Sequence, residues 1–168
     1  QGLSHFLEHM LFMGSKKYPN ENYFEERLTN LGGSYNAFTD DLETVYFISL
    51  NQSGADEVLD IFSRFFIDPL FNKGSVAREL KAIESEHQKN IQADMWRLIR
   101  GINNLAKKDH VLSKFGTGNL ETLKKDKLLE TMKSYYTKYY VANNMSCCIT
   151  SSLDFEIIEG YVRKYFEV

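Results

Sequence analysis

The sequence has little of what marks several large classes of protein. Its only cysteines, Cys147 and Cys148, are adjacent, so on a strand they would point to opposite faces and form neither a disulfide nor a shared metal site. They are expected to be small buried residues of a reduced protein, which favours the cytoplasm. No apolar run approaches the roughly 18–20 residues of a membrane span, and no signal-peptide pattern is present. The net charge of −3 argues against nucleic-acid binding.

The remaining composition is that of an ordinary globular protein. Hydrophobic residues make up 43% and charged residues 26% of the 168 residues, enough for one domain with a substantial core. The chain begins at Gln1 without an initiator methionine and close to a motif described below. We therefore expect it to be a piece of a longer protein.

The spacing of apolar residues predicts helices and strands in a mixed order. Helices are predicted over residues 2–13, 21–31, 54–67, 74–107, 120–140 and 154–166, the fourth with a bend near Gly101. Strands are predicted over residues 34–39, 43–51 and 145–151, and the first two form a hairpin around Asp40-Asp41. Strands among helices without strict alternation indicate an α+β fold, a sheet covered by helices.

The first predicted helix carries the segment His5-Phe6-Leu7-Glu8-His9. Residues four apart lie on one helix face a turn apart, so the two imidazoles can converge on one point, with Glu8 beside them. Polar groups on such an apolar helix are costly to bury unless something satisfies them, and a zinc ion would do so. The alternative is two structural histidines and a surface glutamate.

A catalytic zinc site needs a third protein ligand, and the helix predicted over 74–107 offers several candidates. Glu79 and Glu86 are seven residues apart and share a face, so spacing alone does not choose between them. Glu84 points away from that face. His87 is a possible ligand but lies about 100° from Glu86, so a surface or hydrogen-bonding role is expected for it. The loop Gly116-Thr117-Gly118 lacks the lysine and the preceding strand of a phosphate-binding loop.

The motif order His-x-x-Glu-His extends into a longer resemblance that covers more than two thirds of the chain. The matching segments are Gly2-Leu3-Ser4-His5-Phe6, Glu8-His9-Met10-Leu11-Phe12, Gly14-Ser15-Lys16-Lys17-Tyr18-Pro19, Asn36-Ala37-Phe38-Thr39, Pro69-Leu70-Phe71, Ser85-Glu86-His87, Lys89-Asn90, Trp96-Arg97-Leu98 and residues 113–119. In these the chain resembles the N-terminal catalytic region of the insulysin/pitrilysin family of zinc metallopeptidases, most closely the insulin-degrading enzyme and nardilysin branch.

The resemblance implies one zinc ion in the domain, with His5, His9 and Glu86 as its ligands. Glu79 then matches a second acidic position of the family that orients or charge-balances a ligand. Glu8 would be the general base that activates a zinc-bound water. The implied activity is that of a zinc-dependent endopeptidase acting on peptides and small polypeptides.

The resemblance also implies where substrate binds. Asn36, Ala37, Phe38 and Thr39 match the strand edge that pairs with the substrate backbone in the family, a mode that gives loose sequence preference. Phe38 and Trp96 are candidate substrate-side groups, with burial in the core as the alternative for each.

For the organisation of the whole protein, the resemblance implies that residues 1–168 are part of the N-terminal catalytic domain of a larger multi-domain metallopeptidase. Its sheet would be mainly antiparallel, covered by helices on one face and incomplete at its N-terminus. The C-terminal half of the same protein would be the missing partner, so the segment alone would be weakly active or inactive. The alternative function is a non-catalytic scaffold or interaction homologue of the same fold.

Overall fold

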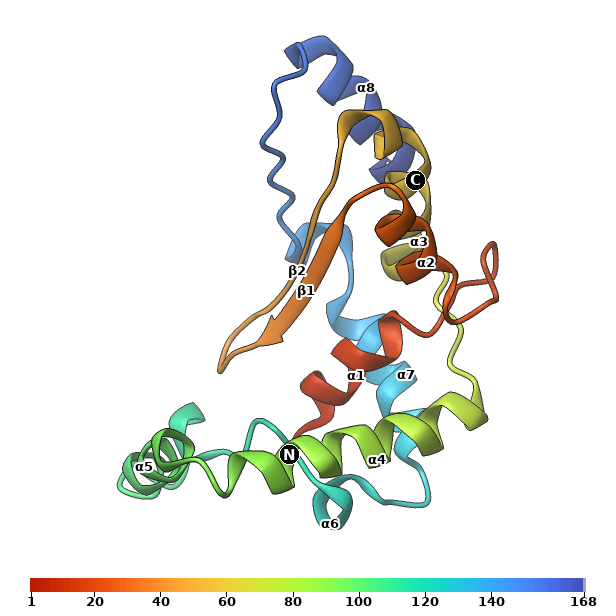
Figure 1. Cartoon of the computed structure of the whole chain (residues 1–168). Helices are drawn as coiled ribbons and strands as arrows, with labels where there is room; N and C mark the ends of the chain where they lie inside the picture. Colours follow the sequence, from red (N-terminus) through yellow and green to blue (C-terminus); the bar gives the residue numbers. More distant parts are fainter. Residues whose placement is uncertain (168) are drawn as a thin grey trace. The chain divides into compact units, whose positions relative to one another are not determined.

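The computed structural model describes residues 1–167 and has an α+β fold, as the sequence predicts (Figure 1). The helices and strands are α1 (Leu3–Leu11), α2 (Tyr23–Asn30), β1 (Ser34–Thr39), β2 (Thr44–Ser49), α3 (Ala55–Ile67), α4 (Lys73–Asn90), α5 (Asp94–Asn103), α6 (Leu120–Leu123), α7 (Leu128–Tyr139) and α8 (Phe155–Phe166). Short 3-10 turns span Gln52–Gly54, Val111–Ser113 and Ala142–Asn144. In the described part of the chain, β1 and β2 pair as a two-stranded antiparallel hairpin.

The contacts divide the chain into two compact units, and the first contains residues 1–10, 37–46 and 71–133. Its helix α6 packs against α4. The backbone N–H of Leu120, at the start of α6, donates to Oε2 of Glu84 at 2.8 Å, and this bond lowers the pKa of that carboxyl. Asn119 caps the same helix through Thr122. Glu84 therefore has a structural role at the N-terminus of α6.

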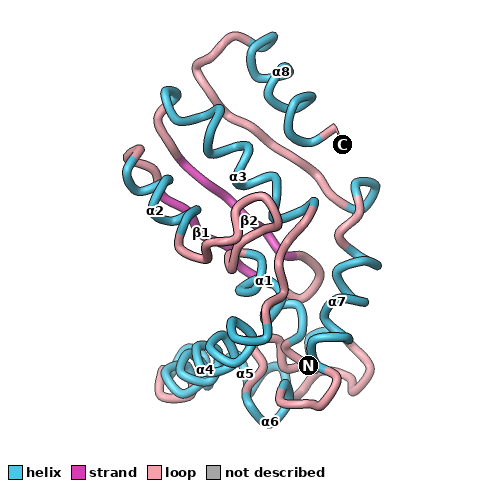
Figure 2. Tube along the Cα trace, turned by 90° about the vertical axis from the view of Figure 1, so that its right-hand side faces the viewer, coloured by secondary structure: helices cyan, strands magenta, loops and turns pink. Residues whose placement is uncertain are grey.

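The second unit contains residues 11–36, 47–70 and 134–168, of which residue 168 lies outside the described part. In this unit α3 packs against both α2 and α8 (Figure 2). Its core holds an aromatic cluster in which Phe24 contacts Phe65, Tyr35 and Phe12 with ring centroids 4.9–6.0 Å apart. Residues 54–67, expected to be a helix from the spacing of their apolar residues, thus bury Val58 and Phe65 in this core.

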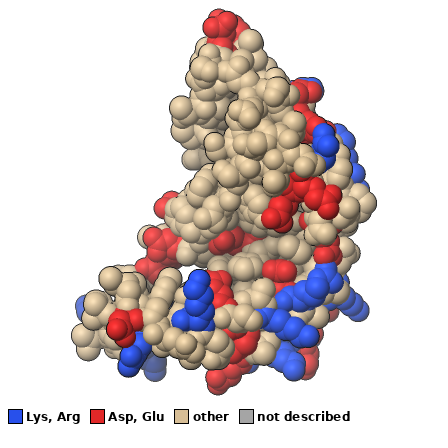
Figure 3. All heavy atoms as spheres, in the orientation of Figure 1, with Lys and Arg blue, Asp and Glu red and all other residues tan. Residues whose placement is uncertain are grey.

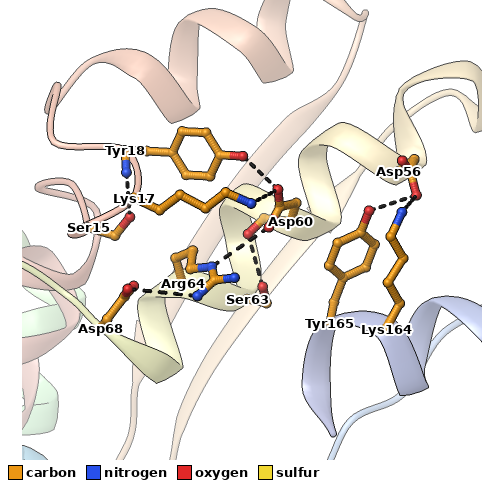
Figure 4. A network of polar contacts seen from close by, with 10 residues as sticks. All are labelled: Ser15, Lys17, Tyr18, Asp56, Asp60, Ser63, Arg64, Asp68, Lys164 and Tyr165. Carbon is orange, nitrogen blue, oxygen red and sulfur yellow. Dashed lines mark hydrogen bonds and ion pairs between the residues drawn. The ribbon is translucent and has the colours of Figure 1, made fainter. Parts of the chain in front are cut away.

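Polar contacts hold α3 of the second unit to the loop after α1 and to α8 (Figure 4). Lys17 and Tyr18 both donate to Oδ2 of Asp60, at 2.5 and 2.6 Å. One turn earlier on α3, Asp56 accepts a hydrogen bond of 2.7 Å from the hydroxyl of Tyr165. Burial alone would raise the pKa of Asp60, but the Lys17 and Tyr18 hydrogen bonds hold it below its ordinary value.

Two long predicted helices are interrupted in the structure. The helix predicted over 74–107 ends at Asn90 and restarts at Asp94, because Ala93 has extended backbone angles and Asp94 begins a new first turn. The helix predicted over 120–140 is likewise divided into α6 and α7 by residues 124–127, the charged run Lys-Lys-Asp-Lys. Gly101, near which a bend is expected, lies within α5.

The strand predicted over residues 145–151 is wrong. Within residues 1–167 this segment has no regular structure and no partner strand, and a strand forms only where a neighbour satisfies its backbone groups. Cys147 and Cys148 are exposed rather than buried. Residues 141–153, which lead to α8, contain no charged side chain, while in Figure 3 charges of both signs appear over α4 and α5. No helix among the described residues is long and apolar enough to cross a membrane.

Candidate metal centre

Helix α1 brings the two histidines of the sequence motif together within the first unit. The rings of His5 and His9 meet edge to face with centroids 4.8 Å apart, and their Nε2 atoms are 3.3 Å apart. The remaining faces of the helix are fixed by the fully buried residues Phe6, Leu7 and Met10. The packing of these residues fixes the orientation of the helix about its axis, and the Nε2 atoms of the two imidazoles converge on one point.

Helix α4 carries the two glutamates that share a face, Glu79 and Glu86, and they contact different nitrogen atoms of the two histidines. Oε2 of Glu86 lies 3.5 Å from Nε2 of His5 and 3.8 Å from Nε2 of His9. Oε2 of Glu79 instead lies 3.0 Å from Nδ1 of His9, on the far side of that ring. The geometry thus distinguishes two residues that sequence spacing leaves equivalent. Glu86 lies near the converging Nε2 atoms, and Glu79 lies near Nδ1 of His9.

Both histidines have an acceptor at Nδ1, which determines their tautomers. Nδ1 of His5 lies 2.8 Å from the carbonyl oxygen of Thr117, a group that can only accept, so this nitrogen carries a hydrogen. Nδ1 of His9 donates to Glu79 in the same way. When both rings are neutral, the two Nε2 lone pairs therefore face one another, an arrangement that repels unless a cation lies between them.

The spacing of the three converging atoms fits a zinc ion. Tetrahedral ligands at a zinc–ligand distance of about 2.0–2.1 Å lie about 3.3 Å from one another. The Nε2 atoms of His5 and His9 and Oε2 of Glu86 are separated by 3.3, 3.5 and 3.8 Å. Two imidazoles and one carboxylate are a common ligand set of catalytic zinc, which leaves a fourth position for water or substrate. His5, His9 and Glu86 thus form a group that could hold a metal ion.

The charges around the pair also favour a cation. Burial alone would lower the pKa of His9, but the hydrogen bond and charge of Glu79, with the charges of Glu8 and Glu86, raise it above its ordinary value. The same carboxylates would stabilise a metal ion held at the Nε2 atoms.

The carbonyl of Thr117 reaches His5 because two glycine backbones nearly touch. An added Cβ on Gly2 would lie 2.3 Å from Cα of Gly118, and both glycines have positive φ, 81° and 76°. Sequence analysis did not identify Thr117 as a site residue, since a backbone carbonyl has no side-chain signature. The signal that could have found it is the Gly116-Thr117-Gly118 loop, rejected as a phosphate site and then left without a role.

Glu8 lies on α1 between the two histidines and is only 6% exposed. Its Oε2 accepts a hydrogen bond of 2.5 Å from the hydroxyl of Thr39 at the end of β1, and Thr39 in turn lies 3.1 Å from the hydroxyl of Thr44. Thr39, which the sequence predicts to be part of the substrate strand, is therefore hydrogen-bonded to Glu8, the expected general base.

The other residues of the expected substrate strand lie along an open edge. Within residues 1–167, β1 pairs only with β2, which leaves its other edge without a neighbouring strand. Asn36 and Phe38 are exposed and Ala37 is half-buried. Phe38 and Trp96 are each 47% exposed, so the alternative that these aromatics belong to the core is wrong.

Two other candidates from the long predicted helix do not approach the converging nitrogens. Glu84 is bonded to α6, as described above, and His87 contacts the ring of Phe115 edge to face with centroids 5.1 Å apart. Arg100 lies 5.6 Å from the centroid of the same ring, on its face. His87 thus packs in a small aromatic and basic cluster of the first unit.

Comparison with known proteins identifies the family to which this arrangement belongs. Residues 1–109 match the family described as Insulinase (Peptidase family M16), and residues 127–168 match the Peptidase M16 inactive domain. The chain is 45% identical over 166 residues to an insulin-degrading enzyme homolog of Dictyostelium discoideum, and 39% identical over 172 residues to the insulin-degrading enzyme of Homo sapiens. These alignments cover 99% and 98% of this chain but 17% of each relative.

Other relatives agree in sequence and in fold. A protein of Schizosaccharomyces pombe named putative zinc protease mug138 is 40% identical over 172 residues, 98% of this chain and 18% of its own length. The crystal structure of pitrilysin superposes with a TM-score of 0.93 at 33% identity, over 99% of this chain and 18% of that one. The chain thus spans less than a fifth of the length of these relatives. It belongs to the insulinase family of peptidases, family M16.

Proposed function

We propose that this chain carries the catalytic centre of a zinc-dependent endopeptidase that hydrolyses peptides and small polypeptides. The observation that carries the proposal is the convergence of His5, His9 and Glu86 within 3.8 Å of one another, beside the buried carboxylate of Glu8. The printed names of its relatives, insulin-degrading enzyme and zinc protease, support the same activity.

His5, His9 and Glu86 would hold one zinc ion through Nε2, Nε2 and a carboxylate oxygen. When bound, zinc would supply a Lewis acid that makes water more acidic and polarises a peptide carbonyl. Thr117 and Glu79 would keep both imidazoles in the tautomer whose lone pair points to the metal, since each accepts the hydrogen on Nδ1.

Glu8 would act as the general base and then as the acid. Its carboxylate would take a proton from the attacking water and then donate that proton to the leaving amine. Its position on α1, between two residues whose rings are fixed, keeps the carboxylate near the proposed metal throughout. Its low exposure limits competition from bulk water for the same proton.

Residues 36–39 of β1 would bind the substrate backbone as an added strand. The edge of β1 away from β2 offers the backbone groups that such pairing requires. Because main-chain hydrogen bonds are blind to side chains, this mode supports cleavage of many peptide sequences. Phe38 and Trp96, both exposed, are then available for contacts with substrate side chains.

The test is hydrolysis of a quenched fluorogenic peptide by the protein in its full natural length. Glu8→Gln keeps the shape of the side chain but cannot accept a proton, so kcat should fall by more than about 100-fold while bound zinc stays at one per chain. Glu26→Gln, the same change at an exposed position of α2, should leave kcat unchanged.

Undiminished hydrolysis by Glu8→Gln would contradict the role of Glu8. If the unmodified protein bound one zinc per chain and cleaved none of a varied set of peptides, the proposal would be wrong. The result would then indicate the alternative, a non-catalytic homologue that keeps the metal site.

A further inference from the structure

We propose that Thr39 is a positioning residue that orients the carboxylate of Glu8 for proton transfer, and that Thr44 orients Thr39 in turn. This inference rests on the proposed function, because the orientation of Glu8 matters for turnover only if Glu8 moves a proton. It assigns a role to two hydroxyl groups of the β1–β2 hairpin that the metal site and the substrate edge do not use.

The direction of each hydrogen bond follows from the groups involved. An ionised carboxylate can only accept, so the hydroxyl of Thr39 donates its single hydrogen to Oε2 of Glu8. The two oxygen atoms are 2.5 Å apart. The contact of 3.1 Å between the two threonine hydroxyls must then be donated by Thr44. The three groups form one oriented series from Thr44 through Thr39 to Glu8, in which each bond strengthens the next.

The hairpin keeps the two threonines opposite one another. Thr39 is the last residue of β1 and Thr44 the first of β2, and the turn between them is closed by a hydrogen bond of 2.8 Å from Asp40 N–H to the carbonyl oxygen of Glu43. β-branched side chains have few rotamers, which limits the positions their hydroxyls can take. The hydroxyl of Thr39 is therefore held where Glu8 needs a donor.

Restraint of one carboxylate oxygen has a consequence for the chemistry. With Oε2 bonded to Thr39, Oε1 is the oxygen that takes the proton and returns it, from a fixed place rather than after rotation of the side chain. A charge-assisted hydrogen bond to a nearly buried carboxylate is among the stronger bonds of its kind. Its loss should slow the chemical step more than it weakens substrate binding.

Thr39 also connects Glu8 to the strand proposed to bind substrate. It is the final residue of the segment 36–39, so a peptide paired along β1 would run toward the residue that holds the general base. Substrate binding and base orientation would then depend on the same hairpin.

The experiment compares three variants of the full-length protein by hydrolysis of a quenched fluorogenic peptide. Thr39→Val removes the hydroxyl and keeps the shape, and kcat should fall about tenfold or more with KM within about twofold. Thr39→Ser restores the donor and should stay within about threefold of the unmodified protein in kcat. Thr29→Val, the same substitution at an exposed position of α2, should change nothing.

Three results would overturn the inference. These are a kcat of Thr39→Val close to that of the unmodified protein, a loss in Thr39→Ser as large as in Thr39→Val, and loss of zinc from Thr39→Val. The second would show a packing role for the threonine methyl group, and the third a role in the metal site itself.

A fourth variant keeps the test decisive if Thr39→Val does not fold. Thr44→Val removes only the outer hydrogen bond, and its kcat should fall by about two- to fivefold. An unchanged kcat in that case would overturn the inference. Failure of the proposed function is recognised separately, because the unmodified protein would then cleave no peptide, or Glu8→Gln would retain its activity.

Discussion

Among single residues, Glu79 and Glu86 show most clearly how position decides chemistry. They lie on the same face of α4, yet one faces Nδ1 of His9 and the other faces both Nε2 atoms. A helical wheel cannot separate them, because residues seven apart nearly superpose. Only the contacts of α4 with His5 and His9 of α1 separate them, and these contacts are not encoded in local spacing.

Zinc affinity should therefore fall in a set order when these carboxylates are changed. Glu86→Gln removes the charge of a proposed ligand and should weaken zinc binding by more than about 100-fold. Glu79→Gln keeps the ligands but loses the charge behind His9, and should cost about tenfold. Competition with a chromophoric chelator measures both constants in the full-length protein, with Glu26→Gln as the control. If Glu79→Gln lost zinc while Glu86→Gln kept it, the two assignments would have to be exchanged.

The close contact between the backbones of Gly2 and Gly118 leads to a second prediction about zinc affinity. A Cβ on Gly118 would lie 2.9 Å from Cα of Gly2 and 2.8 Å from Cδ1 of Leu123, at a φ of 76° that side chains avoid. The loop should shift and take the carbonyl of Thr117 away from His5, so Gly118→Ala should bind zinc about tenfold more weakly.

The matched control for that variant lies two residues away. Gly116 has nothing within 4 Å of an added Cβ, so Gly116→Ala should bind zinc as tightly as the unmodified protein. Equal affinities for the two alanine variants, measured by the same chelator competition, would show that the Thr117 carbonyl does not support the metal site.

At the level of helices and strands, local patterning predicted much of the structure. The hairpin of β1 and β2 and helices α2, α3 and α8 lie within a few residues of their expected ends. The breaks within the two long predicted helices are local, but other features depend on partners distant in the chain. Residues 145–151 have strand-forming side chains but, in the part of the chain that the structure describes, no strand beside them. Glu84 is bonded to the start of a helix 36 residues later.

The contact between α3 and the preceding loop yields a prediction about local stability. Asp60 accepts hydrogen bonds from Lys17 and Tyr18, and its side chain is 17% exposed (Figure 4). Asp60→Asn should lower the free energy of opening of residues 15–20 by about 1 kcal/mol, a modest value because Lys17 is partly solvated. Amide hydrogen exchange of this segment in the full-length protein measures the change, with the exposed turn variant Asp41→Asn as control.

The same variant has a pH signature with a definite sign. The pKa of Asp60 is lowered in the folded protein, so its stabilising contribution is present above the unfolded value of about 3.9 and is lost as the pH falls through the folded value. The difference between the unmodified protein and Asp60→Asn should therefore shrink in acid, after correction for intrinsic exchange rates. A difference that persists unchanged well below pH 4 would contradict this account.

At the scale of the whole molecule, the proposed metal site and the proposed substrate site differ in how complete they are within this chain. The three proposed ligands and the two Nδ1 acceptors all lie between His5 and Thr117. In the proposed substrate site, by contrast, the edge of β1 away from β2 has no neighbouring strand within residues 1–167, and Phe38 and Trp96 are exposed. The chain spans 17% of the length of its insulin-degrading relatives.

This difference predicts that residues 1–168, produced alone, keep their affinity for zinc but lose most of their catalytic activity. Once circular dichroism shows that the segment is folded, it should bind one zinc with an affinity within about tenfold of the full-length protein, because every ligand and its support are present. Its kcat/KM on a fluorogenic peptide should be lower by about 100-fold or more, since a single open edge holds substrate loosely. Metal analysis after gel filtration and peptide hydrolysis measure the two quantities. A folded segment without zinc would show that the metal site needs residues outside 1–168, and full activity would show that β1 alone is a sufficient substrate site.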